Sequence, residues 1–195
     1  MDGKHPSSKM KIGPWTRLSS RDTYDNPWIQ IREDQVLRPN GSLGIYGVVH
    51  YKNLAVGVVA LHANGQVILV GQHRYPLNYY SWEIPEGGCL RDKETLEAAA
   101  ARELREETGY TAKCWDYLGE FILSNSTSDE VGHLFLAREL TPGPSQPDST
   151  EEIHVKTMEF EEAWRQAMSG ELTESMTIVG LARAKYFLAM ENSAE

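Results

Sequence analysis

One segment constrains this chain more than any other: an Ala-rich run whose apolar helical stripe turns into a group of carboxylates. The stripe consists of Leu96, Ala99, Ala100, Glu103 and Glu107, with Glu106 at its edge. Spacings of three and four residues place these side chains on one face of a helix. Thr95 is a good N-cap, and Gly109 is a good residue to follow the last turn. The segment is therefore predicted to be a helix that begins at Leu96.

Carboxylates are unfavourable at the end of that helix. Like charges three and four residues apart repel by roughly 0.2–0.5 kcal/mol per pair. Anions in the last turn also face the negative end of the helix dipole, at about 0.3–1 kcal/mol each. A divalent cation bound between the carboxylates removes these penalties, and oxygen ligands select Mg²⁺ or Mn²⁺ rather than zinc. The alternative is an acidic helix end that is simply solvated.

The spacing of the surrounding residues resembles a known family motif. Gly88 is followed by five residues and Glu94, then by seven residues and the run Arg102-Glu-Leu-Arg-Glu-Glu-Thr-Gly109-Tyr110. This pattern resembles the Nudix box at every fixed position, with Tyr110 where the family usually carries a bulky aliphatic residue. The resemblance extends over roughly residues 28–190 and is to the ADP-ribose pyrophosphatase and nucleoside-diphosphate-sugar hydrolase branch.

That resemblance implies a metal site. Glu103 and Glu107 would be the principal ligands of Mg²⁺ or Mn²⁺, with Glu106 completing the group. The backbone carbonyl of Gly87 would be a further ligand, and the Gly87-Gly88 pair allows such a close approach. Arg102 and Glu94 are expected to orient the ligands rather than to bind the ion.

The resemblance also implies a general base outside the box, in an acidic loop before a late strand. That loop is Asp148-Ser-Thr-Glu151-Glu152. Glu151 is the first candidate and Glu152 the second, and Glu106 is retained among the catalytic residues. The alternative is that this loop, which follows a Pro-rich stretch, is a solvated connection.

Three residues are predicted to bind substrate. Arg74, in a Gln-His-Arg-Tyr-Pro segment similar to that of the branch, suits bidentate recognition of phosphate; the alternative is a surface salt bridge. Glu83 matches a Glu-x-Pro-x-Gly pattern of the branch and is expected to contact substrate or metal-bound water. Trp28 suits stacking on a nucleobase, or else packs in a core or an interface. The 124–130 segment lacks the Pro and Gly that relatives carry there, so the sugar pocket is not defined.

The order of elements predicts a mixed α/β fold, which the resemblance identifies as the Nudix α/β/α sandwich with an N-terminal β-strand extension. Residues 1 to about 24 are expected to form an irregular or weakly stranded arm, and Pro85–Gly88 a loop. Eight strands are expected at 28–37, 43–51, 54–61, 66–72, 79–84, 113–123, 131–137 and 153–158, the first two and the next two as hairpins. Two helices follow, at 160–168 and about 175–190. Residues 1–50 form the extension, for dimerisation and base binding, and residues 51–195 the hydrolase domain.

Charge and composition exclude several classes of protein. The formal net charge of −9 disfavours nucleic acid as a partner. No apolar run reaches the ~20 residues that a membrane span needs. The first residues lack a signal-peptide pattern, so a cytoplasmic location is expected. None of the six histidines pairs with another at a spacing of three or four residues, which disfavours zinc.

The function predicted from these features is Mg²⁺-dependent hydrolysis of ADP-ribose or a related nucleoside diphosphate sugar by a homodimer. The products would be a nucleoside monophosphate and a sugar phosphate. One alternative keeps the fold but acts on dinucleoside polyphosphates or nucleoside triphosphates. Another is a non-catalytic sensor of ADP-ribose or sugar nucleotides, which the complete set of box glutamates disfavours.

Overall fold

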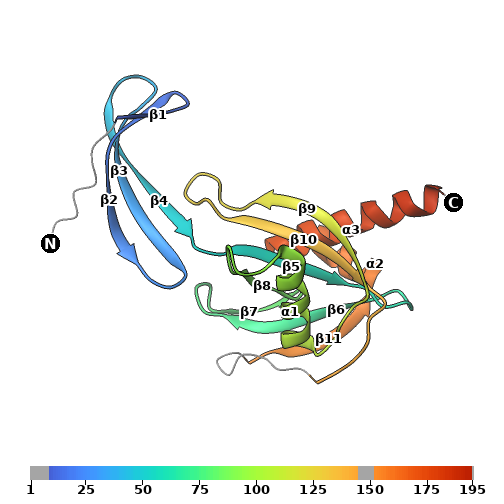
Figure 1. Cartoon of the computed structure of the whole chain (residues 1–195). Coiled ribbons are helices and arrows are strands. Elements are labelled where there is room, and N and C mark those ends of the chain that lie inside the picture. Colours follow the sequence, from blue (N-terminus) through green and yellow to red (C-terminus); the bar gives the residue numbers. More distant parts are fainter. Residues whose placement is uncertain (1–8, 145–151, 195) are drawn as a thin grey trace. The chain divides into compact units, whose positions relative to one another are not determined.

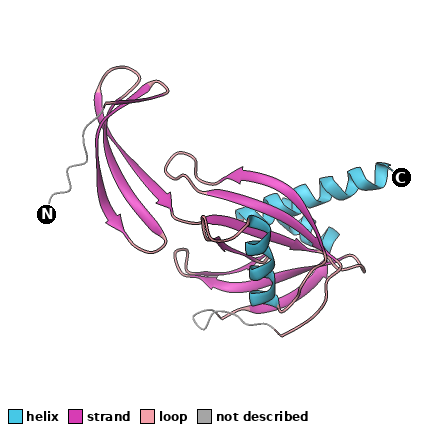
Figure 2. Ribbon diagram, viewed as in Figure 1, coloured by secondary structure: helices cyan, strands magenta, loops and turns pink. Residues whose placement is uncertain are grey.

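The computed structural model describes residues 9–144 and 152–194 and has an α/β architecture (Figures 1 and 2). The elements are β1 (Met10–Ile12), β2 (Trp15–Asp25), β3 (Ile29–Leu37), β4 (Leu43–Tyr51), β5 (Leu54–Ala60), β6 (Gln66–Arg74), β7 (Tyr79–Glu83), β8 (Glu86–Cys89), α1 (Leu96–Thr108), β9 (Cys114–Ile122), β10 (Val131–Arg138), β11 (His154–Glu159), α2 (Phe160–Ser169) and α3 (Ser175–Ala194). None of the described helices is long and apolar enough to cross a membrane.

The described residues form two compact units, and the larger contains Leu54–Phe121 and the described residues from Gly132 onward. Its first sheet has the strand order β8-β5-β10-β9, in which β5 runs parallel to β10 and antiparallel to β8. Its second sheet, β11-β6-β7, is antiparallel. The mixed sheet that the sequence predicts is confirmed.

Two apolar cores lie on opposite faces of these sheets. Because side chains alternate along a strand, the two faces of β5 contribute to different cores. Val56 and Val58 pack with Ala100 and Leu104 of α1, while Val59 packs with residues of α2 and α3. This layering makes the larger unit an α/β/α sandwich, as predicted.

The box helix begins and ends where the sequence indicates. The Thr95 hydroxyl accepts a hydrogen bond from the Ala98 N–H at 3.1 Å, and Gly109 takes the left-handed conformation with φ of 77°. Glu107, by contrast, is 4% exposed although it carries a carboxylate. Such burial requires a polar partner.

The smaller unit contains the described residues up to Asn53 together with Ile122–Val131. Strands β1 to β4 form an antiparallel sheet in sequence order. The 122–131 segment is hydrogen-bonded to β4: the Val49 N–H donates to the Thr127 carbonyl at 2.8 Å, and the Tyr46 hydroxyl to the Ser126 carbonyl at 2.7 Å. Asp129 accepts from the Tyr51 N–H at 2.9 Å.

Two local predictions are wrong, and a third is sharpened. The described part of the N-terminal arm, which is expected to be irregular or weakly stranded, contains β2, an eleven-residue strand that pairs along most of β3. Pro85–Gly88 is not a loop, because β8 pairs with β5. Strands β5 and β6 are consecutive but belong to different sheets, with only an isolated Leu61–Val67 bridge between them, so they do not form a hairpin ladder.

Candidate active site

Strand β8 brings backbone groups to the carboxylates of α1. In an antiparallel pair, successive residues direct their N–H and C=O groups alternately toward and away from the partner strand. The Pro85 carbonyl accepts from Val58 of β5, whereas the Glu86 N–H donates to Glu107 Oε2 at 3.0 Å. The Gly88 carbonyl accepts from Arg102 at 2.7 Å. The alternation therefore directs the Gly87 carbonyl toward β5 and the Glu86 carbonyl to the edge that holds Glu107.

Gly87 lies directly against the Glu103 carboxylate. A Cβ built on Gly87 would lie 2.2 Å from the Glu103 carboxyl carbon, so any other residue here would displace the Glu103 carboxylate. Glycine thus lets the strand approach the helix with Glu103 in its present position. The metal ligand expected at the Gly87 carbonyl stays a prediction, and the Glu86 carbonyl is the alternative on the same strand.

Arg102 holds the carboxylates of the box in place. It donates to Glu94, to Glu103 at 2.7 Å and to Glu106 at 3.0 Å. These hydrogen bonds, with that to Glu94 first, raise the pKa of the Arg102 guanidinium, and Arg102 in turn lowers the pKa of Glu94. That Arg102 and Glu94 orient metal ligands stays a prediction, which these hydrogen bonds support.

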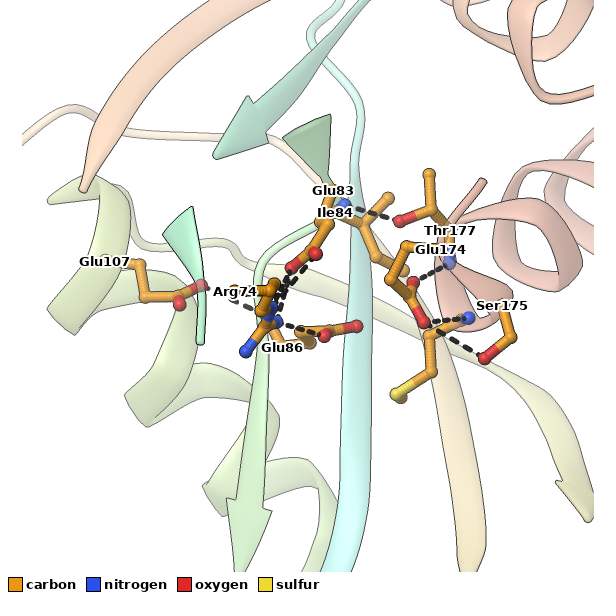
Figure 3. A network of polar contacts seen from close by, with 9 residues as sticks. Arg74, Glu83, Ile84, Glu86, Glu107, Glu174, Ser175 and Thr177 are labelled. Carbon is orange, nitrogen blue, oxygen red and sulfur yellow. Dashed lines mark hydrogen bonds and ion pairs between the residues drawn. The ribbon is translucent and has the colours of Figure 1, made fainter. Parts of the chain in front are cut away.

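A second group of charges lies where three strands end (Figure 3). Arg74 is the last residue of β6, Glu83 the last of β7 and Glu86 the first of β8. Arg74 Nε donates to both carboxylate oxygens of Glu83 at 3.0 Å, and Arg74 Nη2 bonds Glu83 Oε2 and, at 2.6 Å, Glu86 Oε1. The side chain of Glu83 is fully buried, while that of Arg74 is 34% exposed.

The start of α3 adjoins this group. The Ile84 N–H donates to the Thr177 hydroxyl at 3.0 Å, which ties the strand-to-strand connection to the helix. The Glu174 carboxylate accepts from the N–H groups of Met176 and Thr177. In Figure 3, Glu107 of α1 lies on one side of the Arg74 group and the first turn of α3 on the other.

Within the Arg74 group, Glu86 has the least favourable surroundings for an ionised carboxylate. Burial raises the pKa of its carboxyl well above the ordinary 4.5, and the charges of Glu174 and Glu83 raise it further against the opposing effect of Arg74. Its Oε2 is buried and has no hydrogen-bond partner among the described residues. Burial would lower the pKa of Arg74, but its hydrogen bond to Glu83 and the charge of Glu86 outweigh this and raise it.

The oxygen atoms near the box are of the kind that bind a hard divalent cation. They belong to carboxylates and backbone carbonyls, with no thiolate or imidazole among the residues named above. The unpartnered Glu86 oxygen and the tight Gly87 approach are features that an ion would explain. In the described part of the chain, however, no three acidic, histidine or cysteine side chains converge closely enough to hold an ion as they lie.

The roles of three other predicted residues stay predictions. Glu152 is exposed and precedes β11 by two residues. Trp28 precedes β3 in the smaller unit and is 68% exposed. Glu151, the first candidate for the base, lies outside the described residues.

Glu86 of the Arg74 group and Glu174 beside it were not among the sequence candidates. The Pro-Glu-Gly-Gly run has the composition of a loop, so nothing marked Glu86 as buried. Glu174 has a detectable signal, since an acidic residue just before Ser175 suits the start of a helix.

The comparisons with known proteins agree with this architecture. Residues 51–176 match the NUDIX domain, and residues 15–49 match the nucleoside diphosphate sugar hydrolase N-terminal domain. The chain is 34% identical to an ADP-ribose pyrophosphatase of Bacillus subtilis (strain 168), covering 82% of this chain and 86% of that protein. It is 32% identical to an ADP-ribose pyrophosphatase of Mycobacterium tuberculosis (strain ATCC 25618 / H37Rv), covering 84% and 80%.

A solved crystal structure shares the fold. An ADP compounds hydrolase superimposes with a TM-score of 0.82 over 93% of this chain and 98% of that chain, at 17% identity. The fold and the carboxylate-bearing helix define a hydrolase of the Nudix type. The chain belongs to the Nudix family, as one of its pyrophosphohydrolases.

Proposed function

We propose that this protein hydrolyses the diphosphate bond of ADP-ribose or a related nucleoside diphosphate sugar with the help of Mg²⁺. The observation that carries the proposal is the convergence of Glu103 and Glu107 of α1 on the edge of β8, beside an arginine. The names of the two ADP-ribose pyrophosphatases support the substrate class. The match of residues 15–49 to a domain of nucleoside diphosphate sugar hydrolases supports it independently.

The residues of the site divide the work. When bound, Mg²⁺ would neutralise the diphosphate and make water at the site a better nucleophile. Glu103, Glu106 and Glu107 would hold the ion, together with a backbone carbonyl of β8, and Arg102 and Glu94 would orient them. Arg74 would meet a phosphate oxygen, and positioning and charge neutralisation would supply most of the catalysis.

The general base is proposed to be Glu151, with Glu152 as the second candidate. Glu152 is exposed, so its carboxylate is accessible to solvent. Trp28 is proposed to stack on the base of the nucleotide, for which its 68% exposure leaves a face available. The boundary between extension and hydrolase domain at residue 50, and the cytoplasmic location, stay predictions.

The test is a substrate panel with product identification. ADP-ribose, a second nucleoside diphosphate sugar, a diadenosine polyphosphate and a nucleoside triphosphate are incubated with Mg²⁺, and products are identified by mass spectrometry. We expect AMP and ribose 5-phosphate from ADP-ribose, at the highest kcat/KM of the panel. Preference for the polyphosphate or triphosphate would overturn the substrate assignment, and binding without cleavage would indicate a sensor.

We also propose that the protein is a homodimer. The smaller unit buries a single hydrophobic residue, Val36, in its described part. It leaves large apolar side chains exposed, namely Met10, Ile12, Tyr24, Trp28, Leu43, Ile45 and Ile122. A sheet with so little core needs further burial to be stable, and a second copy of the chain can supply it.

The mass in solution checks this proposal. Light scattering is expected to give twice the 22.0 kDa of one chain. Leu43→Glu with Ile45→Glu places charges on that apolar surface and is expected to give monomers. Because both side chains are largely exposed, the double variant should still fold. A wild-type mass of one chain would contradict the proposal.

A further inference from the structure

Two carboxylates accept hydrogen bonds from Arg74, one more than its single positive charge requires. A guanidinium presents five N–H groups in a rigid plane, and one bidentate carboxylate already fixes that plane. Glu83 supplies this contact from a fully buried position. Glu86 adds a further hydrogen bond at Nη2, 2.6 Å long. Neutralisation of Arg74 therefore does not explain the presence of Glu86.

Glu86 is also costly to the folded protein. Its side chain is 12% exposed, and its Oε2 has no hydrogen-bond partner in the described part of the chain. An unsatisfied buried oxygen destabilises a fold by roughly 1–3 kcal/mol, and more when charged. Glu83, Glu107 and Glu174 surround it with like charge. Because these features make Glu86 destabilising, its presence is better explained by a functional contact than by a contribution to stability.

The contact that Glu86 makes restricts one side chain. Hydrogen bonds among the described residues use Nε and Nη2 of Arg74 and leave Nη1 outside them. If Glu83 were the only partner, the long Arg74 side chain would be held by a single carboxylate. With both glutamates, the guanidinium is held at two edges, from the ends of β7 and β8. Nη1 is then the part that a ligand can approach.

We propose that Glu86 is a positioning residue that fixes Arg74 with Nη1 directed at a phosphate oxygen of the substrate. This inference rests on the proposed function and deepens it, because it names a residue that determines affinity for the diphosphate. The supports of the group are rigid: three strand ends carry it, and the Ile84–Thr177 hydrogen bond ties their connection to α3. Preorganisation of this kind lowers the entropy lost when substrate binds.

The central experiment compares Glu86→Ala and Glu86→Gln with wild type, using ADP-ribose and Mg²⁺. Glu86→Ala frees one edge of Arg74 and is expected to raise KM about tenfold, the usual scale for one hydrogen bond to a charged group, with kcat changed less than about threefold. Glutamine keeps an acceptor for Nη2 and is expected to restore KM to within about threefold of wild type. Glu162→Ala, which removes an exposed carboxylate on α2, is the matched control.

A double-mutant cycle with Arg74→Ala separates positioning from a structural role. If Glu86 acts through Arg74, Glu86→Ala raises KM less than about twofold in the Arg74→Ala background. A full tenfold effect in that background, or an unchanged KM in the single variant, would overturn the proposal. Equal KM values for the Ala and Gln variants would overturn it as well. Absence of ADP-ribose hydrolysis by wild type is a different result, which rejects the proposed function instead.

Discussion

Glu107→Gln is expected to lower kcat/KM for ADP-ribose by about 1000-fold or more at saturating Mg²⁺. Loss of an anionic metal ligand removes several kcal/mol of charge stabilisation, and each ~1.4 kcal/mol is a factor of ten in rate. The fold should survive, because a glutamine oxygen can still accept the hydrogen bond from the Glu86 N–H, now 3.0 Å long. Steady-state kinetics measures the fall in kcat/KM, and calorimetric titration measures the affinity of the variant for Mg²⁺.

Glu97→Gln is the matched control for that variant. Glu97 is on the same helix but is exposed and lies in its first turn. Its replacement is expected to leave kcat/KM within about twofold, as for a surface change away from special features. A Glu107→Gln enzyme with more than a tenth of wild-type kcat/KM would remove Glu107 from the metal site.

Arg102→Ala is expected to destabilise the metal-free protein by about 2 kcal/mol, between the roughly 0–1 of exposed ion pairs and 3–5 of buried ones. The intermediate value follows from the 29% exposure of the Arg102 side chain. Its removal leaves Glu94, Glu103 and Glu106 without their common cation. Mg²⁺ should therefore raise the melting temperature of Arg102→Ala more than that of wild type. An equal shift in both proteins would contradict this account of the site.

The same variant should change the dependence of stability on pH. In wild type, Arg102 holds the pKa of Glu94 below its ordinary 4.5. A carboxyl whose folded pKa is depressed stabilises the fold above its unfolded pKa, and this contribution is lost as pH falls through the folded pKa. Denaturation of the metal-free proteins at pH 7 and below pH 4.5 should thus show a difference that shrinks with acidification. A difference that grows would have the wrong sign.

Much of the fold could be predicted because local signals agree with the tertiary contacts. The caps at Thr95 and Gly109 determine α1, and the continuous apolar run from Leu54 corresponds to a strand buried on both faces. Strand β2 could be predicted only as an irregular or weakly stranded arm, because its side chains are largely polar and at most partly buried, so its alternation is weak. The separation of β5 from β6 depends on which sheets form, and adjacent residues carry no information about that.

The candidate site shows the same limit. Box spacing predicts which residues of α1 carry charge, since a helix fixes their relative positions. Spacing does not predict that Gly87 is paired with Val56 and so directs its backbone groups toward β5. Nor does it predict that Glu86 reaches Arg74, twelve residues earlier in the chain, because that contact requires the ends of β6 and β8 to meet.

The hydrogen bonds between β4 and the 122–131 segment have a consequence for how such a protein can be cut or recombined. The segment lies inside the hydrolase domain in sequence but makes its contacts with the N-terminal sheet. A truncation that begins at Leu54 would leave the Ser126 and Thr127 carbonyls without the donors they now have. A chimera that exchanges the first fifty residues between homologues would also have to exchange the 122–131 segment. The smaller unit is therefore encoded by two separate stretches of the gene.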